Sequence, residues 1–422
     1  MAREMKDSGI EWIGEIPKEW NVAKVKYHLH RNEPRNPGNC IVLSLYRELG
    51  IVPKDSRDDN HNVTSLDISN YKYVRIGDFV INKMKAWQGS VAVSDYEGVV
   101  SPAYYVYNFI DDSFDKRFIH YLLRSCYKDE FRRLSGGIRE GQWDLSSDSF
   151  DNTLLIIPPL PEQEKIAKFL DSECARIDEV ISKTKSTIEE YKKLKQSVIT
   201  EAVTKGIRAN REMKDSGIEW IGEIPKEWEI TCIKRFCKLQ TGSTPSTANS
   251  EWFDGSLDWF TPCDFNEQYL LSNSQRKLSE NAKADNVATI IPENTVLLIG
   301  IGGTAGKIGM TTYECSCNQQ ITALITKELV GKFLMYWLIA NTKFLKETAL
   351  YTTLPILNNE TIGEYLLLVP FGSEQQEIAD YLDKKCAEIN TLITKKEQIV
   401  SELESYKKSL IYEYVTGKKE VV

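Results

Sequence analysis

The sequence predicts an α+β protein in which two mixed α/β domains are joined by two long antiparallel coiled-coil helices, with a pseudo-twofold internal repeat. Residues 3–20 recur without a change at 211–228, an offset of 208 positions. Residues 158–206 also align without a gap with residues 370–418, and 19 of these 49 positions are identical. Each half of the chain therefore holds a short shared segment, a variable region and a long shared segment, which indicates a tandem duplication.

The long shared segments are predicted to be helices, because mostly apolar positions alternate steps of four and three residues, the spacing of a coiled-coil seam. These positions are Leu170, Cys174, Ile177, Ile181, Thr184, Ile188, Tyr191, Lys195, Val198 and Ala202, and then Leu382, Cys386, Ile389, Ile393, Lys396, Val400, Leu403, Lys407, Leu410 and Tyr414. Each helix is expected to run for about 40 residues, or ~60 Å. Two matching seams in one chain are expected to pack against each other, although two independent dimerisation zippers would use the same pattern.

The variable regions, residues 21–157 and 229–369, have mixed patterning. Each contains β-rich stretches and a helical piece, at 118–123 and 333–338, and each ends in an apolar strand before a proline. The two regions are therefore expected to share a fold without sharing a sequence. The predicted divisions of the chain are a first domain (1–157), a central helix (158–207), a second domain (208–369) and a C-terminal helix (370–422).

The composition excludes several classes of protein. Apolar residues make up 41% of the 422 and charged residues 27%, which excludes a collagen-like or wholly disordered chain. No apolar stretch approaches the ~20 residues that cross a bilayer, and the N-terminus has no secretory pattern, so we expect a cytoplasmic protein without membrane contact. The net charge of −8 indicates that any nucleic-acid binding must be local or shared with a partner.

Neither a metal site nor a catalytic site is expected. The nine cysteines are predicted to be reduced thiols, and all four histidines lie in the first third of the chain. Residues 300–305 fit the G-x-G-x-x-A pattern of a dinucleotide loop, but poor helix formers follow, and Ile308 stands where a phosphate-binding loop needs Ser or Thr. A glycine-rich turn, or a loop that approaches a DNA backbone, explains these residues better. No hydrolase, metalloprotease, kinase or adenine-methyltransferase motif occurs, so no catalytic residue is assigned.

Recognition chemistry remains, because basic residues, amides and indoles cluster in two segments of the first variable region, a mixture that suits phosphates and base edges. The candidate DNA-binding residues there are Lys83, Lys85, Trp87, Gln88, Arg139, Gln142 and Trp143. Those of the second region are Thr241, Ser243, Thr244, Lys307, Asn318, Gln319, Thr352 and Thr353. The structural alternative is that Trp87 and Trp143 belong to a core and that the polar residues lie in turns.

Together these features resemble the DNA-specificity (S) subunit of Type I restriction-modification systems over the whole chain. The resemblance rests first on the twin Gly-Ile-Glu-Trp-Ile-Gly-Glu-Ile-Pro-Lys-Glu-Trp stretches, which are similar to the start of each target-recognition domain of the family. It also rests on Pro-Leu-Pro-Glu-Gln-Glu-Lys-Ile-Ala at 159–167, on Ser-Glu-Gln-Gln-Glu-Ile-Ala at 373–379, and on segments 77–84 and 241–245.

The resemblance implies a non-catalytic subunit whose two target-recognition domains each read one half of a bipartite double-stranded DNA site, with the helix pair as a spacer. It also implies a complex with two modification subunits, which use S-adenosylmethionine to methylate adenine N6, and with restriction subunits that use ATP and Mg²⁺. No cofactor is expected in this chain itself.

The identical 18-residue segments suggest a separate hypothesis. Equivalent surfaces would let two copies of one modification subunit dock, with Trp12, Trp20, Trp220 and Trp228 as candidate partner-binding residues. A recent duplication at the DNA level would leave the same identity without any contact. The alternative function is a non-catalytic coiled-coil adaptor that binds proteins rather than DNA, and sequence-dependent DNA binding would separate the two.

Overall fold

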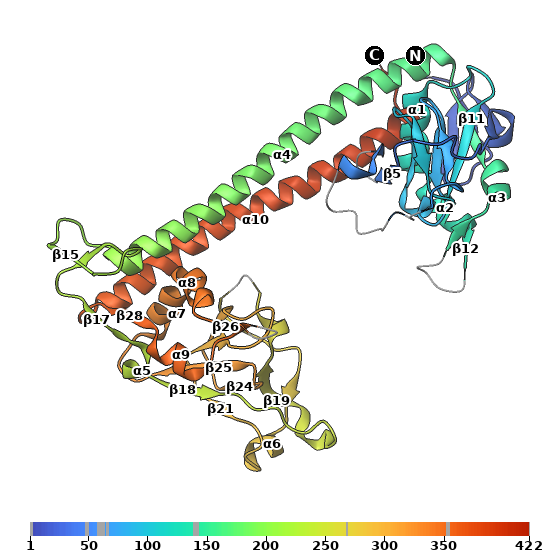
Figure 1. Cartoon of the computed structure of the whole chain (residues 1–422). Coiled ribbons are helices and arrows are strands. Elements are labelled where there is room, and N and C mark those ends of the chain that lie inside the picture. The colour runs from blue at the N-terminus through green and yellow to red at the C-terminus, as the bar shows by residue number, and fades with distance from the viewer. Residues whose placement is uncertain are drawn as a thin grey trace. The chain divides into compact units, whose positions relative to one another are not determined.

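The computed structural model describes residues 3–46, 50–56, 64, 67–137, 143–266, 269–351 and 355–421 (Figure 1). The chain divides into two compact units: unit 1 comprises Met1–Lys185 with Gln398–Val422, and unit 2 comprises Ser186–Glu397. Each unit holds one copy of the repeated segment, one mixed α/β domain and a part of each long helix. Among the described residues, none of the helices combines the length and apolar character needed to span a membrane.

The two long helices are α4 (Leu160–Lys205) and α10 (Glu374–Val415), as the sequence predicted. α4 begins ahead of its first predicted seam position, so Pro161 lies in its first turn. Proline is tolerated there because its missing N–H would have no partner within the helix. All the predicted seam positions of both helices are buried or half-buried, which confirms the heptad pattern.

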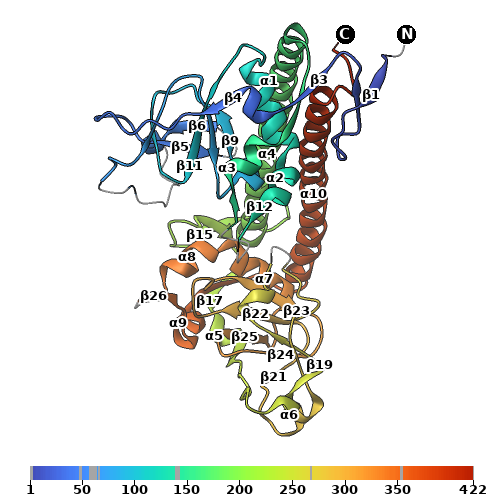
Figure 2. The same cartoon turned by 90° about the vertical axis from the view of Figure 1, so that its right-hand side faces the viewer.

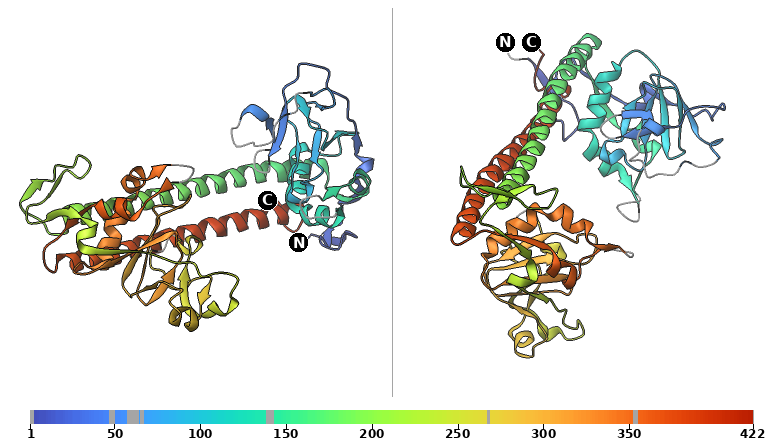
Figure 3. Two further views of the ribbon diagram at one scale, coloured as in Figure 1. Left: turned by 60° about the horizontal axis from the view of Figure 1, so that its bottom comes forward. Right: turned by 60° about the vertical axis from the view of Figure 1, so that its left-hand side comes forward.

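Parts of α4 and α10 pair antiparallel within each unit, as can be followed in Figure 3. In unit 1 the rings of Phe169 and Tyr414 lie 4.5 Å apart, and Lys407 Nζ lies 2.6 Å from the carboxylate of Asp178. The residue numbers fall along α10 as they rise along α4, which defines the antiparallel direction. The predicted pairing within one chain is thus confirmed, and the seams do not serve independent dimerisation zippers.

The domain of unit 1 contains a four-stranded antiparallel sheet in the order β4-β11-β8-β9. Its strands are β4 (Leu29–Arg31), β11 (Tyr104–Phe109), β8 (Phe79–Asn82) and β9 (Val91–Val93). Two antiparallel strand pairs, β5 (Leu43–Tyr46) with β6 (Gly50–Pro53) and β7 (Lys72–Val74) with β10 (Gly98–Val100), contribute to the same hydrophobic core. The domain also contains α1 (Lys116–Tyr121), the π-helix η4 (Leu122–Cys126), α2 (Lys128–Leu134), β12 (Ser135–Gly136), β13 (Asp144–Leu145) and α3 (Ser147–Asp151).

The domain of unit 2 has the same frame, with the order β18-β25-β22-β23. Figure 2 labels β22, β23 and β25 of this sheet. Its strands are β18 (Cys237–Thr241), β25 (Ile321–Thr326), β22 (Thr295–Ile299) and β23 (Ile308–Thr311). In both units the first strand of the domain pairs with the last, β3 (Asn21–Lys24) with β14 (Leu154–Ile157) and β17 (Glu229–Cys232) with β28 (Leu366–Val369). The expectation of a shared fold with divergent sequence is therefore confirmed.

Unit 2 also contains a second sheet, in the order β20-β19-β24-β21. These strands are β20 (Lys277–Leu278), β19 (Phe253–Phe260), β24 (Cys315–Cys317) and β21 (Ile290–Ile291). The helices of this domain are α5 (Ile233–Phe236), α6 (Glu280–Ala284), the buried α7 (Gly331–Ala340), α8 (Thr342–Glu347) and α9 (Asn359–Glu364). The part of α4 in this unit contacts α10 through Lys195 Nζ, which donates to Asn390 Oδ1 (3.0 Å).

The repeated segment forms a hairpin in each unit, with β1 (Met5–Asp7) and β2 (Glu15–Pro17) in unit 1 and β15 (Met213–Asp215) and β16 (Glu223–Pro225) in unit 2. In unit 1 it packs on the residues that end α10. Gly417 there has φ +72°, and a Cβ on it would lie 2.4 Å from Pro17 Cδ and 3.0 Å from the Trp20 ring. The hairpin and the helix end thus approach each other so closely that only glycine fits.

Candidate nucleic-acid interface and repeated hairpins

Trp143, the described candidate of the second segment of unit 1, and the adjoining Asp144 lie beside the first segment. Lys83 Nζ forms an ion pair with Asp144 (2.9 Å), and the backbone N–H of Leu145 donates to Lys83 O (3.0 Å). The rings of Trp87 and Trp143 lie 5.8 Å apart with their planes at 63°. Sequence separation had hidden this contact, which joins the β8–β9 connection and the start of β13 into one surface.

An arginine links the two tryptophans of this surface. The guanidinium of Arg132, from α2, lies 5.9 Å from the ring centroid of Trp87 and 5.7 Å from that of Trp143, within cation–π range. Trp87 also donates from Nε1 to Met84 O (3.1 Å), and both indoles are half-buried. The tryptophans therefore support the surface and still expose part of each ring.

The two lysines of the β8–β9 connection differ in what they can offer. The hydrogen bond to Asp144 raises the pKa of Lys83, and the carboxylate compensates the positive charge of the lysine. Lys85 is exposed, and with Trp87 and Gln88 it lines a cavity of about 520 Å³. Lys85 is thus available to bind a phosphate, whereas Lys83 fixes the β8–β9 connection to β13.

Four of the predicted DNA-binding residues lie outside the described part of the chain. They are Arg139, Gln142, Thr352 and Thr353.

Five predicted residues of unit 2 come together where β18 ends. Ser243 N donates to Cys317 O (2.9 Å), which brings the 241–245 segment against the residues that follow β24. Thr244 Oγ1 donates to Gln319 Oε1, and both side chains are exposed. Asn318 is buried, and its side-chain Oδ1 accepts from the backbone N–H of Gln320 (3.1 Å). The remaining member is Thr241.

Two members of this cluster bind other parts of the domain through their hydroxyl groups. Ser243 Oγ donates to Val287 O (3.1 Å), and Thr241 Oγ1 accepts from Asn359 Nδ2 (3.0 Å). At Gly242 a Cβ would lie 2.3 Å from Cys317 O, so this segment needs glycine to pass close to β24. Thr244 and Gln319 are therefore the members best placed to meet a ligand.

The glycine-rich run of unit 2 is the connection between β22 and β23. A strand and not a helix follows it, so the dinucleotide pattern is rejected and a glycine-rich turn is what the chain forms. Gly302 and Gly306 adopt φ +107° and +85°. Lys307 is exposed and its Nζ lies 3.4 Å from Phe265 O. In the shared frame, this connection occupies the same place as the one that carries Lys85.

The tryptophans of the repeated hairpins fall into two classes. Trp20 and Trp228 are 0% and 1% exposed, so they cannot present a surface to a partner. Their indole N–H groups donate to Glu162 (2.9 Å) and Glu374 (3.1 Å) at the starts of the long helices. Their assignment as partner-binding residues is corrected on this point, because they hold each hairpin to a helix.

The sequence analysis did not identify Glu162 and Glu374, which accept these hydrogen bonds. Glu162 and Glu374 also pair with Arg3 and Arg211 of the hairpins. The neighbouring Gln163 and Gln375 bind the domains, because their side-chain oxygens accept from Asp115 N and Val330 N, both at 2.9 Å. The signal was present in the sequence, since the Glu-Gln pair is identical at the start of both long segments.

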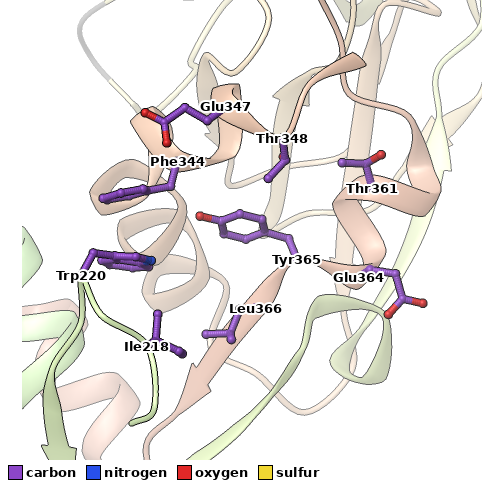
Figure 4. A pocket seen from close by; sticks show the side chains of 9 residues that line it. All are labelled: Ile218, Trp220, Phe344, Glu347, Thr348, Thr361, Glu364, Tyr365 and Leu366. Atoms are coloured by element: carbon purple, nitrogen blue, oxygen red, sulfur yellow. The ribbon is translucent and has the colours of Figure 1, made fainter.

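The other two hairpin tryptophans, Trp12 and Trp220, are half-buried. Trp12 meets the Tyr127 ring edge-on at 4.9 Å, and Trp220 stacks on Phe344 at 4.4 Å. They lie beside grooves of their units, of which Figure 4 shows the one in unit 2.

Burial is the main cause of the pKa shifts of one histidine and two cysteines in the domains. Burial, followed by the charge of Arg124, lowers the pKa of His120 to about 4. Burial raises the pKa of the Cys126 thiol to about 12 and that of Cys315 to about 11, which keeps both protonated at neutral pH. In the described residues, no three His, Cys, Asp or Glu side chains gather as metal ligands would.

Comparison with known proteins identifies the family. The family model of the Type I restriction modification DNA specificity domain matches residues 22–190 and 225–402. The putative type I restriction enzyme MjaX specificity subunit of Methanocaldococcus jannaschii is 23% identical over 96% of this chain and 95% of its own length. The type I restriction enzyme MjaIX specificity subunit of the same organism is 32% identical over 38% of each chain.

Solved structures share the fold. A chain from a structure described as the structural basis underlying complex assembly and conformational transition of the type I R-M system aligns with a TM-score of 0.75, at 16% identity, over 96% of this chain and 99% of that one. The crystal structure of the HsdS subunit from Thermoanaerobacter tengcongensis aligns with a TM-score of 0.53, at 16% identity, over 96% and 98%. The chain therefore belongs to the Type I restriction-modification DNA specificity family and is a non-catalytic specificity subunit that recognises the DNA target of its system.

Proposed function

We propose that the chain reads a bipartite double-stranded DNA site, with one half-site contacted by the domain of each unit. The observation that carries this proposal is the shared four-stranded frame, which offers different side chains from the same connection. In unit 1 the β8–β9 connection carries Lys85, Trp87 and Gln88, which combine a charge, an indole and an amide. In unit 2 the β22–β23 connection is rich in glycine and ends in Lys307. One frame with two surface chemistries suits two different half-sites.

Within each surface the exposed side chains are proposed to contact DNA and the internally bonded ones to position them. Lys85, Lys307 and Gln319 belong to the first class. Lys83 and Ser243 belong to the second, because both are half-buried and their polar side-chain atoms bind other parts of the domain. Asn318 also belongs to the second class, and Arg139, Gln142, Thr352 and Thr353 remain predictions from the sequence.

We further propose that the target-recognition domains comprise residues 1–157 and 208–369, and that the helices of 158–207 and 370–422 set the separation of the half-sites. This is supported by the continuity of α4, whose 46 residues belong to both units. A helix of that length extends ~70 Å. This length exceeds the ~34–36 Å that separates two DNA-binding domains bound to one face of the duplex, one helical turn apart.

The chain is proposed to act in the cytoplasm within a complex. Two modification subunits, which use S-adenosylmethionine to methylate adenine N6, and restriction subunits, which use ATP and Mg²⁺, would be its partners. The net charge of −8 supports a shared DNA interface, because partners that clamp the duplex would supply much of the phosphate contact.

The test is long-read mapping of N6-methyladenine in host DNA with and without this gene, while the modification subunit is expressed. We expect deletion to remove methylation at one gapped, two-part motif. A Gln88→Ala variant should alter one half of that motif and leave the other half and the gap unchanged. Methylation that persists after deletion would contradict the proposal and favour the protein-binding adaptor.

A further inference from the structure

A groove lies beside the repeated hairpin in each unit. In unit 2 it has a volume of about 490 Å³, and Figure 4 shows Ile218 and Trp220 of the hairpin facing Phe344, Tyr365 and Leu366 of the domain. We call this and its counterpart in unit 1 the hairpin grooves. The groove of unit 1 has a volume of about 1180 Å³.

The two hairpin grooves are built in the same way. Ile10 and Trp12 of unit 1 are the copies of Ile218 and Trp220, and each pair lines its own groove. The wall opposite the hairpin comes from the variable domain and includes Leu154 in unit 1, at the start of β14. Leu366 occupies that place in unit 2, at the start of β28. A site with one constant wall therefore occurs twice in one chain.

The floor of each groove is aromatic and partly open. The stacked pair Trp220 and Phe344 has its ring planes at 19°, and both residues are half-buried. In unit 1 the half-buried Trp12 rests on Tyr127, which is fully buried. Tryptophan is, with tyrosine and arginine, enriched among the residues that contribute most to binding at protein interfaces.

The rim of each groove is acidic. In unit 2 the exposed carboxylates of Glu347 and Glu364 stand on opposite sides of the aromatic side chains, as Figure 4 shows, and they are the charged residues among the described ones that line the groove. Glu364 is paired with Lys234, so Glu347 carries the uncompensated charge of this rim. In unit 1 the charged lining residues are Glu11, Asp129, Glu130, Asp148 and one base, Arg133. Arg133 is paired with Glu130. This charge disfavours a DNA backbone and favours a cationic partner.

We propose that each hairpin groove receives the same short segment of a modification subunit, in which one or two aliphatic or aromatic side chains are flanked by Lys or Arg. The inference rests on the proposed function, which places two copies of that subunit on the chain. Two sites with one constant wall match two copies of one partner, and the apolar floor with an acidic rim matches an apolar segment with basic flanks. The divergent domain walls would then adjust the fit of each copy.

The experiment uses the full-length chain co-expressed with the modification subunit of the same system. Charge reversal by Glu347→Lys in unit 2 and by Asp129→Lys in unit 1 changes exposed rim residues and leaves the aromatic floor intact. Each variant should weaken the binding of one modification subunit roughly tenfold. The reversal replaces an attraction between opposite charges across ~7 Å of solvent with a repulsion of the same size. Native mass spectrometry should show one modification subunit per chain in each single variant and none in the double variant at limiting concentration. Glu328→Lys and Asp112→Lys, which reverse exposed carboxylates away from the grooves, should keep two.

A photo-crosslinking residue at Thr348 of the unit 2 groove, and another at Glu11 of the unit 1 groove, identifies the occupant. Both should crosslink to one and the same segment of the modification subunit, and that segment should carry Lys or Arg. Crosslinks to DNA, to the restriction subunit or to two different segments would overturn the inference, and so would unchanged stoichiometry in the rim variants. A wild-type chain that binds no modification subunit would instead refute the proposed function itself.

Discussion

The twin carboxylates that start the long helices allow one interaction to be measured twice in a single molecule. Glu374 accepts from Trp228 Nε1 (3.1 Å) and pairs with Arg211, and the Glu374 and Arg211 side chains are 2% and 10% exposed. Glu162 makes the same contacts with Trp20 and Arg3, but those two charged side chains are 22% and 19% exposed. The perturbation is Glu374→Gln, compared with Glu162→Gln.

The expected cost differs because the surroundings differ. Neutralising Glu374 leaves a nearly buried guanidinium without its main ionic partner, which should cost ~2–4 kcal/mol. Arg211 keeps its ion pair with Glu227, which limits the loss. Water screens the more exposed pair in unit 1, so Glu162→Gln should cost only ~1–2 kcal/mol. The difference between the two variants is thus expected to be about 1–2 kcal/mol.

Hydrogen exchange measured on the full-length chain reports the opening free energy of each hairpin separately. The β15–β16 amides should lose more protection in Glu374→Gln than the β1–β2 amides lose in Glu162→Gln. Glu212→Gln is the control, since the Glu212–Lys226 ion pair is exposed and should contribute at most ~1 kcal/mol. Equal losses, or a larger loss for Glu162→Gln, would refute the reasoning from burial.

Three further predictions concern unit 1 and its DNA surface. Burial holds the pKa of His120 in the folded state at about 4, below its usual 6.5, so the unfolded state takes up a proton first. The free energy of unfolding should therefore fall by of order 3 kcal/mol as the pH drops from 6.5 to 4. Urea unfolding of the His120→Gln variant should lack this loss, whereas the His30→Gln variant, changed at an exposed histidine, should keep it. Lys85→Ala should weaken binding of the complex to all DNA sequences alike and reduce the slope of log K against log salt by ~0.9, measured by fluorescence anisotropy; an unchanged slope would count against a phosphate contact. Gly417→Ala should destabilise unit 1 by ~2–3 kcal/mol in thermal unfolding, because its Cβ would strike the hairpin; Gly9→Ala, at a similar φ of +70° but with nothing within 4 Å, should cost only ~1 kcal/mol.

The long helices were predictable because their signal is local. The steps of four and three residues from Leu170 and from Leu382 depend only on neighbouring turns of one helix. The same holds for the strand before each proline, which appears as β14 and β28. The start of α4 at Leu160 was less evident, since prolines usually mark a boundary and here one lies in the first turn.

Contacts between distant segments were not predictable. The sequence pattern predicted that Trp20 and Trp228 lie on the surface. In the structure they are buried and donate hydrogen bonds to the carboxylates of Glu162 and Glu374, which lie 142 and 146 residues away in the sequence. The same limit applies to Lys83, which a single sequence cannot distinguish from Lys85 until Asp144 is placed beside it. The second sheet of unit 2 depends on similar long-range pairing, including a parallel contact between β19 and β24.

The division of the chain into units bears on how it folds during translation. All residues of unit 2, Ser186–Glu397, leave the ribosome before the last segment of unit 1, Gln398–Val422. Until that segment emerges, the first half of α4 has no helix to cover its seam in unit 1, and the β1–β2 hairpin lacks the helix end on which it packs. We therefore expect the nascent chain to hold a finished second unit while the first still exposes apolar surface, which makes the earlier-synthesised unit the later to mature and the one that depends on chaperones.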